Sequence, residues 1–198
     1  MKTTALTLTI IGMLFSCGNP DRKEQGNDEK DSHANHGSKT QKEDSGKKPL
    51  SPRTASMSNI GDNHIHIDYG SPSKRGRMIF GGLVGFGTVW ATGAHKATTI
   101  SFGKDVIINN IEIPAGKYGL FTIPGEKEWT IIINKDWDMH LADNYNQIND
   151  IVRVTAPVQN LNEVVESLTF EVRQLDQMRG QVNIKWDQVG VSVDIENK

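Results

Sequence analysis

The sequence predicts an all-β domain, an antiparallel two-sheet sandwich with one or two short helical turns. From residue 53 onward, apolar residues recur at every second position, as in strands with one buried face, and not at the 3.6-residue period of helices. The apolar segments are short, rich in β-branched and aromatic residues, and separated by residues that favour turns. We leave the strand order open between jelly-roll and immunoglobulin-like arrangements.

The first expected strands differ in pattern. Ile65, Ile67 and Tyr69 alternate with polar residues, which predicts a strand with one face toward the core. Residues 98–102, Thr-Thr-Ile-Ser-Phe, combine β-branched and aromatic side chains, as strands do.

A hairpin is expected next. Residues 106–108 and 111–113 are separated by Asn109-Asn110, a pair that tolerates the positive φ angles of a two-residue turn. A Pro-Ala-Gly-Lys turn at 114–117 then leads into an expected strand at 118–123, which ends at Pro124-Gly125.

Residues 129–133 are almost continuously apolar, which is typical of a central strand. A further strand is expected at 151–158. The last three expected strands show clean alternation: Leu168, Phe170 and Val172; Val182, Ile184 and Trp186; Val191, Val193 and Ile195.

Two segments do not fit simple strands. Residues 78–94 are rich in glycine, and we expect a short turn of helix near 78–84. Residues 136–150 are polar and irregular, which predicts a long loop of the kind that often carries function.

The N-terminal residues predict export. Residues 1–16 have a positive start and an apolar middle, as in a signal peptide. Their last three residues, followed by Cys17, form Leu14-Phe15-Ser16-Cys17, which resembles a bacterial lipobox. We therefore expect Cys17 to carry palmitate-type acyl chains. The alternative is a plain signal peptide with an incidental cysteine. Residues 17–50 are polar with balanced charges and predict a disordered tether, followed by the folded domain at 51–198.

Composition and the absence of certain motifs argue against several classes of function. The net charge of −2 argues against nucleic-acid binding through a basic face. The single cysteine excludes an intrachain disulfide, so the domain must rely on its apolar core. The sequence has no Gly-X-Ser-X-Gly elbow for a nucleophilic serine. The glycines at 81–87 lack the Gly-Lys-Ser/Thr ending of a phosphate-binding loop, so we expect turns and close packing there.

A metal site is one candidate. His64, His66 and Asp68 would project from one face of a strand, and two imidazoles with a carboxylate form a set of metal ligands. His95 or His140 would complete the set. The alternative, which we favour, is a polar outer face of an edge strand. We therefore expect no cofactor, with a divalent metal as the alternative.

A second candidate is a ligand site formed by five residues: Arg75, Arg77, Trp90, Thr92 and His95. Guanidinium groups bind carboxylates and phosphates in fork geometry, and tryptophan offers a flat face. The competing hypothesis pairs Arg77 with an internal acid such as Asp68 and places Trp90 in the core.

Many segments resemble domain-of-unknown-function family 2911. The matching stretches are 67–69, Pro72, 74–84, 89–94, 97–100, 113–125, 128–130, 134–136 and 152–154, within 51–195. Most members of that family are exported proteins of Gram-negative bacteria, and it has no established activity. The resemblance implies a compact, β-rich, exported domain and no reaction.

The sequence departs from the family pattern at several positions. Ala91 stands where the pattern has arginine, His95 where it has asparagine, and His140 near a usual tryptophan. His64 and His66 stand where the pattern has no histidine, so a histidine metal site would be specific to this chain and not shared by the family. Asp68, Arg77, Trp90, Thr92 and Gly93 fit the pattern, which makes them candidates for a shared site.

These observations predict a lipid-anchored, extracytoplasmic protein at the outer membrane or periplasmic face of the cell envelope. We expect a non-catalytic module that binds a small molecule, a glycan or an envelope protein, with the membrane contacted through the N-terminal lipid. One alternative is a metal-assisted hydrolase using His64, His66, Asp68 and His95. Another is a glycan-binding module using Trp90 with Arg75 and Arg77.

Overall fold

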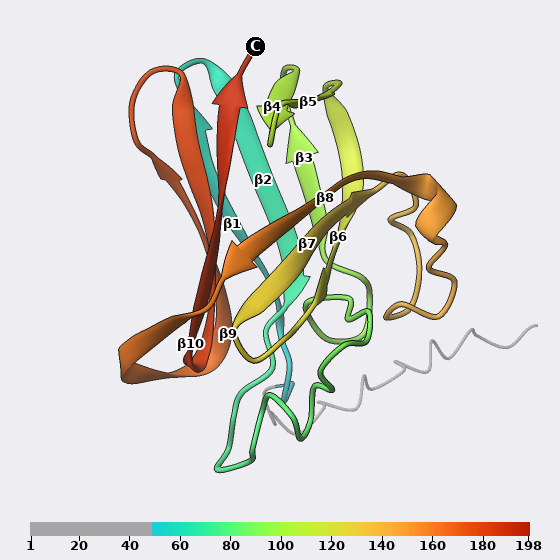
Figure 1. Ribbon diagram of the computed structural model, residues 1–198, viewed down its shortest axis with the longest axis vertical. Coiled ribbons are helices and arrows are strands. Elements are labelled where there is room, and N and C mark those ends of the chain that lie inside the picture. Colours follow the sequence, from blue (N-terminus) through green and yellow to red (C-terminus); the bar gives the residue numbers. More distant parts are fainter. Residues whose placement is uncertain (1–48) are drawn as a thin grey trace, which may run out of the picture. The chain divides into compact units, whose positions relative to one another are not determined.

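The structure, a computed structural model, describes residues 49–198 (Figure 1). The expected signal peptide at 1–16, the acylation site Cys17 and all but the end of the expected tether lie outside the described residues. Among the described residues, no helix is long and apolar enough to cross a membrane.

The domain is a sandwich of two antiparallel sheets, which confirms the predicted fold class. The larger, six-stranded sheet has the order β1-β2-β3-β6-β7-β8, and the four-stranded sheet has the order β5-β4-β10-β9. The strands of the larger sheet are β1 Arg53–Ile60, β2 Asn63–Gly70, β3 Thr99–Phe102, β6 Gly116–Ile123, β7 Glu128–Asn134 and β8 Asp150–Pro157. Those of the smaller sheet are β4 Val106–Ile108, β5 Ile111–Ile113, β9 Gln159–Gln174 and β10 Arg179–Asn197.

The predicted hairpin at Asn109-Asn110 is present. Both asparagines have positive φ angles, 51° and 64°, and Ile108 is paired with Ile111 across the turn. Asparagine accepts this left-handed backbone more readily than other residues with a Cβ, which is why the pair could be recognised in the sequence.

Strand β7 is buried on both faces, which explains its continuous apolar sequence. Ile131 and Ile133 face the core between the sheets, whereas Ile132 joins a second cluster on the outer face of the larger sheet. Phe121 of β6 and Met139 of the loop 135–149 belong to the same second cluster. The predicted long loop therefore covers the outer face of the sheet.

Strand β10 folds back on itself (Figure 1). Asp187, at the reversal, has a φ of 56°. Two side-chain hydrogen bonds join the two halves: Gln181 Nε2 to Asp194 Oδ1 (2.9 Å) and Ser192 Oγ to Asn183 Oδ1 (2.8 Å). Asn197 N, at the end of the strand, donates to the O of Met178, which immediately precedes β10 (2.7 Å). The apolar alternations expected at 182–186 and 191–195 correspond to these two antiparallel halves.

The prediction of a helical turn at 78–84 is wrong. This segment forms hydrogen-bonded turns, in which Leu83 N donates to Met78 O (3.1 Å) and Val84 N to Ile79 O (2.8 Å). Gly81, with a φ of 78°, interrupts any helical path. Within residues 49–198 the one helical element is the 3₁₀ turn Gln147–Asn149, inside the long loop.

Four aromatic side chains connect the sheets to the long segment 71–98. Trp129 comes from β7, Trp186 from β10, and Phe80 and Trp90 from the segment between β2 and β3. The ring centroids of Phe80 and Trp129 are 4.9 Å apart, and Trp90 stacks on Trp186 at 6.0 Å with an interplanar angle of 21°. We call these four residues the aromatic cluster.

A polar clamp holds the end of the long loop. Tyr145 donates its hydroxyl to Asp150 Oδ2 at 2.6 Å, and Arg153 NH1 donates to the same oxygen at 2.7 Å. Asn134 Nδ2 donates to the other carboxylate oxygen at 2.7 Å. Burial, followed by the bond to Asp150, raises the pKa of Tyr145 to about 12.

We predict that the clamp weakens in strong alkali. Because the folded-state pKa of Tyr145 is above the ordinary value of 10.0, its contribution to stability is complete below about pH 10 and is lost as the pH rises through 12. Tyr145→Phe should lower the free energy of unfolding by roughly 1 kcal/mol at pH 8, because the bond to the carboxylate is lost. The difference from the parent, measured by urea unfolding, should shrink at pH 11; an unchanged difference would contradict the assignment.

Candidate functional site

Four of the five candidate ligand residues line one cavity of about 330 Å³. It lies beside the aromatic cluster. The lining residues are Ser51, Pro72, Arg75, Arg77, Leu83, Val84, Trp90, Gly93, Ala94, His95, Leu141 and Trp186. We call it the arginine–tryptophan cavity.

The two arginines are presented by a tight turn after β2. Arg75 and Gly76 have φ angles of 49° and 70°, and Arg77 N donates to Lys74 O at 3.0 Å to close the turn. Arg77 is held further by bonds from NH2 to Ser73 O (2.6 Å) and from Nε to Lys74 O (3.1 Å). The backbone of the turn therefore fixes the Arg77 side chain, whereas that of Arg75 is exposed.

Glu166 of β9 positions this turn. Its carbonyl oxygen accepts from Lys74 N at 2.7 Å and from Trp186 Nε1 at 3.2 Å, and its carboxylate accepts from Arg75 N at 2.8 Å. Lys74 Nζ also forms an ion pair with Asp187 Oδ2 at 2.5 Å. The arginine turn is thus attached to the smaller sheet at several points, although these partners lie far away in the sequence.

Trp90 forms part of the cavity wall while remaining joined to the larger sheet. Its backbone exchanges two hydrogen bonds with Thr122 of β6, at 2.8 and 2.9 Å. Its indole Nε1 donates to Gly93 O at 3.2 Å, and its ring stacks on Trp186. The indole is partly buried, so Trp90 contributes both to the core and to the cavity.

Thr92 lies beneath the cavity and does not line it. The residue is 0% exposed, and its hydroxyl donates to Trp90 O (3.2 Å) and contacts the Thr122 hydroxyl (3.1 Å). Its own carbonyl accepts from Thr98 Oγ1 at 2.9 Å. Thr92 is therefore a positioning residue for the loop that carries Trp90 and His95.

The backbone crossing at Gly70 leaves no room for a side chain. A Cβ at Gly70 would lie 2.3 Å from Ala94 O. This close approach brings the end of β2, which leads to the arginine turn, against the loop that ends at His95.

Backbone strain is concentrated around the cavity. Arg75, Thr92 and His95 have φ angles of 49°, 50° and 66°, in the left-handed region that residues with a Cβ usually avoid. Such conformations cost free energy and are common at binding sites, where the surrounding contacts maintain them.

The cavity lining is cationic. No acidic residue is among the lining residues, and among residues 49–198 neither Arg75 nor Arg77 forms an ion pair. The suggested pair of Arg77 with Asp68 does not form. Asp68 Oδ1 instead lies against Arg53 Nε as an ion pair, although the contact lacks hydrogen-bond alignment. The guanidinium of Arg75 has no hydrogen-bond acceptor in the described part of the chain.

The proposed metal ligands do not form a cluster. His64 is exposed and His66 and Asp68 are partly exposed, so they lie on the outer side of β2. The preferred interpretation placed them on an edge strand, which is wrong, because β2 lies between β1 and β3 in the larger sheet. His64 Nδ1 contacts Asn59 Oδ1 at 2.9 Å, and His140 Nδ1 contacts Asp143 Oδ2 at 2.9 Å. Among residues 49–198, no group of three or more histidine, cysteine, aspartate or glutamate side chains is placed to hold a metal ion.

Sequence reasoning missed three parts of the site: Trp186, Glu166 and Leu141. Trp186 belongs to the apolar alternation of β10, where it resembles an ordinary core residue. Glu166 and Leu141 carry no local pattern, and only the fold brings them to the cavity.

The family model for proteins of unknown function named DUF2911 matches residues 51–195. The chain belongs to the DUF2911 family. No match was found among curated proteins or among solved structures. In this DUF2911 protein, Ala91 is buried in the second cluster and does not line the cavity.

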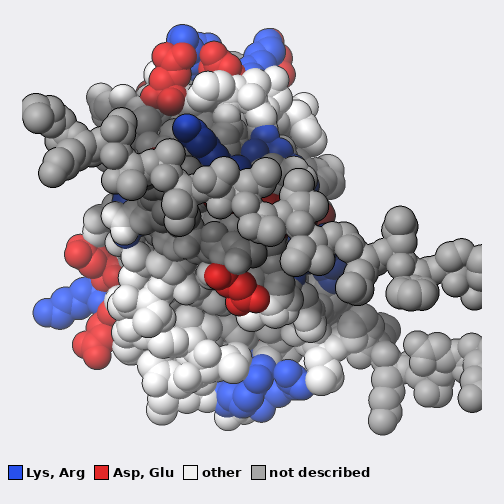
Figure 2. All heavy atoms as spheres, turned by 90° about the vertical axis from the view of Figure 1, so that its right-hand side faces the viewer, with Lys and Arg blue, Asp and Glu red and all other residues white. Residues whose placement is uncertain are grey.

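Charged side chains are dispersed over the face shown in Figure 2. Among the described residues visible there, lysine and arginine lie in separate small groups, and those at the top and the left of the view have acidic side chains beside them. The visible basic groups do not join into a continuous surface of the kind that binds nucleic acid.

We predict that the Thr92 hydroxyl is required for stability. Thr92→Val keeps the shape but leaves the Thr122 hydroxyl without its partner, which should cost about 1–3 kcal/mol. Thr92→Ser, which keeps the hydroxyl, is the matched control. Thermal unfolding should show a Tm several degrees lower for the valine variant than for the serine variant; equal Tm values would contradict the role of the hydroxyl.

Proposed function

We propose that this DUF2911 protein is a non-catalytic binding module of the cell envelope, and that its arginine–tryptophan cavity takes a small organic anion. The observation that carries the proposal is the cationic lining: Arg75 and Arg77 line one cavity, and no acidic residue is among its lining residues. Guanidinium groups without an ion-pair partner in a concave site favour a carboxylate or phosphate. Arg75 can bind such a group through charge-assisted, bidentate hydrogen bonds, whereas Arg77 already donates from Nε and NH2 and contributes its positive charge.

The remaining lining residues support an organic ligand with an apolar body. Trp90, Trp186 and Leu83 provide flat and apolar surfaces, and a volume of about 330 Å³ suits a compact molecule. Aromatic walls with a few polar groups are typical of small-molecule sites. Carboxylates that carry a ring or a short alkyl chain meet both requirements.

The alternatives have less support. A metal-assisted hydrolase needs a ligand cluster, and the described side chains form none. A glycan has less support because it is uncharged and would leave the guanidinium groups of Arg75 and Arg77 without a counter-charge.

The proposed location depends on the N-terminal sequence. Residues 1–16 resemble a signal peptide and Cys17 lies at the end of a lipobox-like sequence, which supports export followed by acylation. Several acyl chains would hold the domain stably at a membrane surface. We therefore propose an extracytoplasmic module, anchored at the outer membrane or the periplasmic face.

We predict that anionic probes bind through the arginines. Benzoate, indole-3-acetate and hexanoate should stabilise the full-length protein in thermal-shift assays, whereas their uncharged amides should not. Arg75→Gln should lower the affinity at least about tenfold, because a charge-assisted hydrogen bond is worth roughly 1.5–3 kcal/mol. Glutamine retains the backbone N–H that bonds to Glu166.

Arg173→Ala is the matched control, because this exposed arginine on β9 is not a lining residue. Calorimetric titration should give the same affinity for the control and the parent. If no anionic probe binds, or if Arg75→Gln binds as tightly as the parent, the proposed ligand class is wrong.

We predict acylation at Cys17. Intact-mass and peptide mass spectrometry of the protein, purified from membranes of its native host, should show an N-terminal Cys17 carrying acyl chains. Cys17→Ser should release the protein from the membrane fraction. A free thiol at Cys17 in the native host would contradict the anchor without affecting the proposed ligand cavity.

A further inference from the structure

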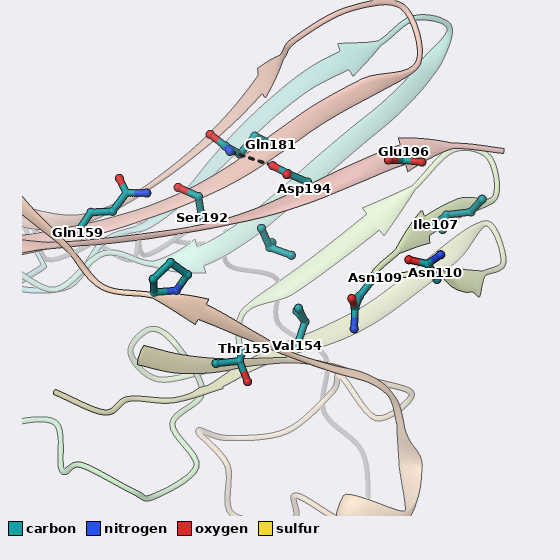
Figure 3. Close-up of a pocket in the computed structure, with 12 residues that line it drawn as sticks. Ile107, Asn109, Asn110, Val154, Thr155, Gln159, Gln181, Ser192, Asp194 and Glu196 are labelled. Carbon is teal, nitrogen blue, oxygen red and sulfur yellow. Dashed lines mark hydrogen bonds between the residues drawn. The ribbon is translucent and has the colours of Figure 1, made fainter. Parts of the chain in front are cut away.

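A second cavity, larger than the first, lies between the edge of β8 and the second half of β10 (Figure 3). Its volume is about 620 Å³. Thr155 of β8 lies on one side, Ser192 and Asp194 of β10 lie on the other, and the hairpin tip with Asn109 and Asn110 lies at one end. We call this cavity the edge groove.

Two strand edges border the edge groove. Strand β8 is the last strand of the larger sheet and pairs only with β7. Strand β10 pairs with β4 only at Glu196 and Asn197, so its residues 191–195 have no strand partner on that side within the described chain. Each unpaired edge presents backbone donors and acceptors that a further strand could use.

The β8 edge carries few of the features that usually protect exposed edges. Its regular part, Val152–Pro157, contains no lysine, and its one proline, Pro157, is the last residue of the strand. Its one basic residue, Arg153, is engaged by Asp150 and Tyr145. Edge strands that are not meant to pair commonly carry such blocking residues.

The edge groove is acidic. Asp194 and Glu196 are exposed, and no lysine, arginine or histidine is among the lining residues. Neither carboxylate forms an ion pair among the described residues. The nearby Arg179 is paired with Asp176 instead. Asp176 raises the pKa of Arg179 more than Asp194 or Glu196 does. The groove is thus complementary to a positively charged occupant.

We infer that the edge groove binds an extended basic peptide segment of another protein, which adds as a strand to β8. Backbone hydrogen bonds to β8 would supply affinity, as in other cases of strand addition. Because side chains alternate along a strand, lysine or arginine at every second position of the peptide would face Asp194 and Glu196 across the groove. This site is independent of the arginine–tryptophan cavity.

A glycan fits the edge groove less well than a peptide. Its lining contains no tryptophan, tyrosine or phenylalanine, so a sugar ring would find no aromatic face. The unpaired backbone edge, in contrast, matches the main chain of a peptide.

The test uses fluorescence anisotropy with the full-length protein and a labelled, end-blocked heptapeptide, Lys-Val-Lys-Val-Lys-Thr-Lys. We expect saturable binding, and no binding of the peptide with glutamate in place of lysine. Two N-methylated versions of the peptide separate strand addition from simple charge attraction. One is methylated at the backbone nitrogens of the odd-numbered residues and the other at those of the even-numbered residues. Because only one edge of the added strand pairs with β8, methylation should abolish binding in one version and preserve it in the other.

Protein variants locate the site. Asp194→Asn and Glu196→Gln should each weaken binding roughly two- to fivefold, as expected for exposed ion pairs. Glu163→Gln, at an exposed position on β9 outside the groove, and Arg75→Gln should bind like the parent. Backbone amide shifts on titration should be confined to β8, β10 and the β4–β5 hairpin.

Three outcomes would overturn the inference. In the first, both N-methylated versions bind equally. In the second, Glu163→Gln weakens binding as much as Asp194→Asn does. In the third, oligosaccharides shift the amides of the groove while the peptide shifts none. Arg75→Gln is expected to weaken anion binding but to leave peptide binding unchanged. A result that refutes the peptide site therefore does not refute the proposed anion site, and the reverse also holds.

Discussion

The contact between Trp90 and Trp186 joins the two sheets beside the arginine–tryptophan cavity. Trp186 belongs to the smaller sheet, Trp90 is hydrogen-bonded to the larger sheet, and Phe80 and Trp129 complete the aromatic cluster between them. Large buried aromatic side chains contribute much of the apolar area that stabilises a core. Here the same packing also forms a cavity wall, so the stability of the sandwich and the shape of the candidate site depend on one set of contacts.

The fold was largely predictable from the sequence, because strands with one buried face leave a two-residue period and turns require particular residues. The alternation around Ile65 and Ile67 and the Asn109-Asn110 turn are examples. The continuous run in β7 also has a direct cause, since the loop that carries Met139 buries its second face. The first half of β9 and strand β1 were less evident, because their side chains are largely exposed.

The candidate site was predictable only where its residues are close in the sequence. Arg75, Arg77, Trp90 and His95 lie within one segment, and the structure brings them to one cavity. Thr92 was grouped with them by proximity, but its hydroxyl is used inside the protein. Glu166 and Trp186 could not be assigned, because their contact with the arginine turn depends on the register of β9 and β10 and on no local pattern.

These long-range contacts have a consequence for the order of folding. The bonds from Ser71 to Leu168 and from Arg75 to Glu166 span 97 and 91 residues. Pairing over such separations carries a loop-closure cost and is slow compared with local hairpins. During synthesis, the arginine turn has no partner until Glu166 of β9 has left the ribosome, and Trp186 and Asp187 follow only with the final strand, Arg179–Asn197. A chain that ended before Trp186 would therefore lack one wall of the cavity even though Arg75, Arg77 and Trp90 were all present.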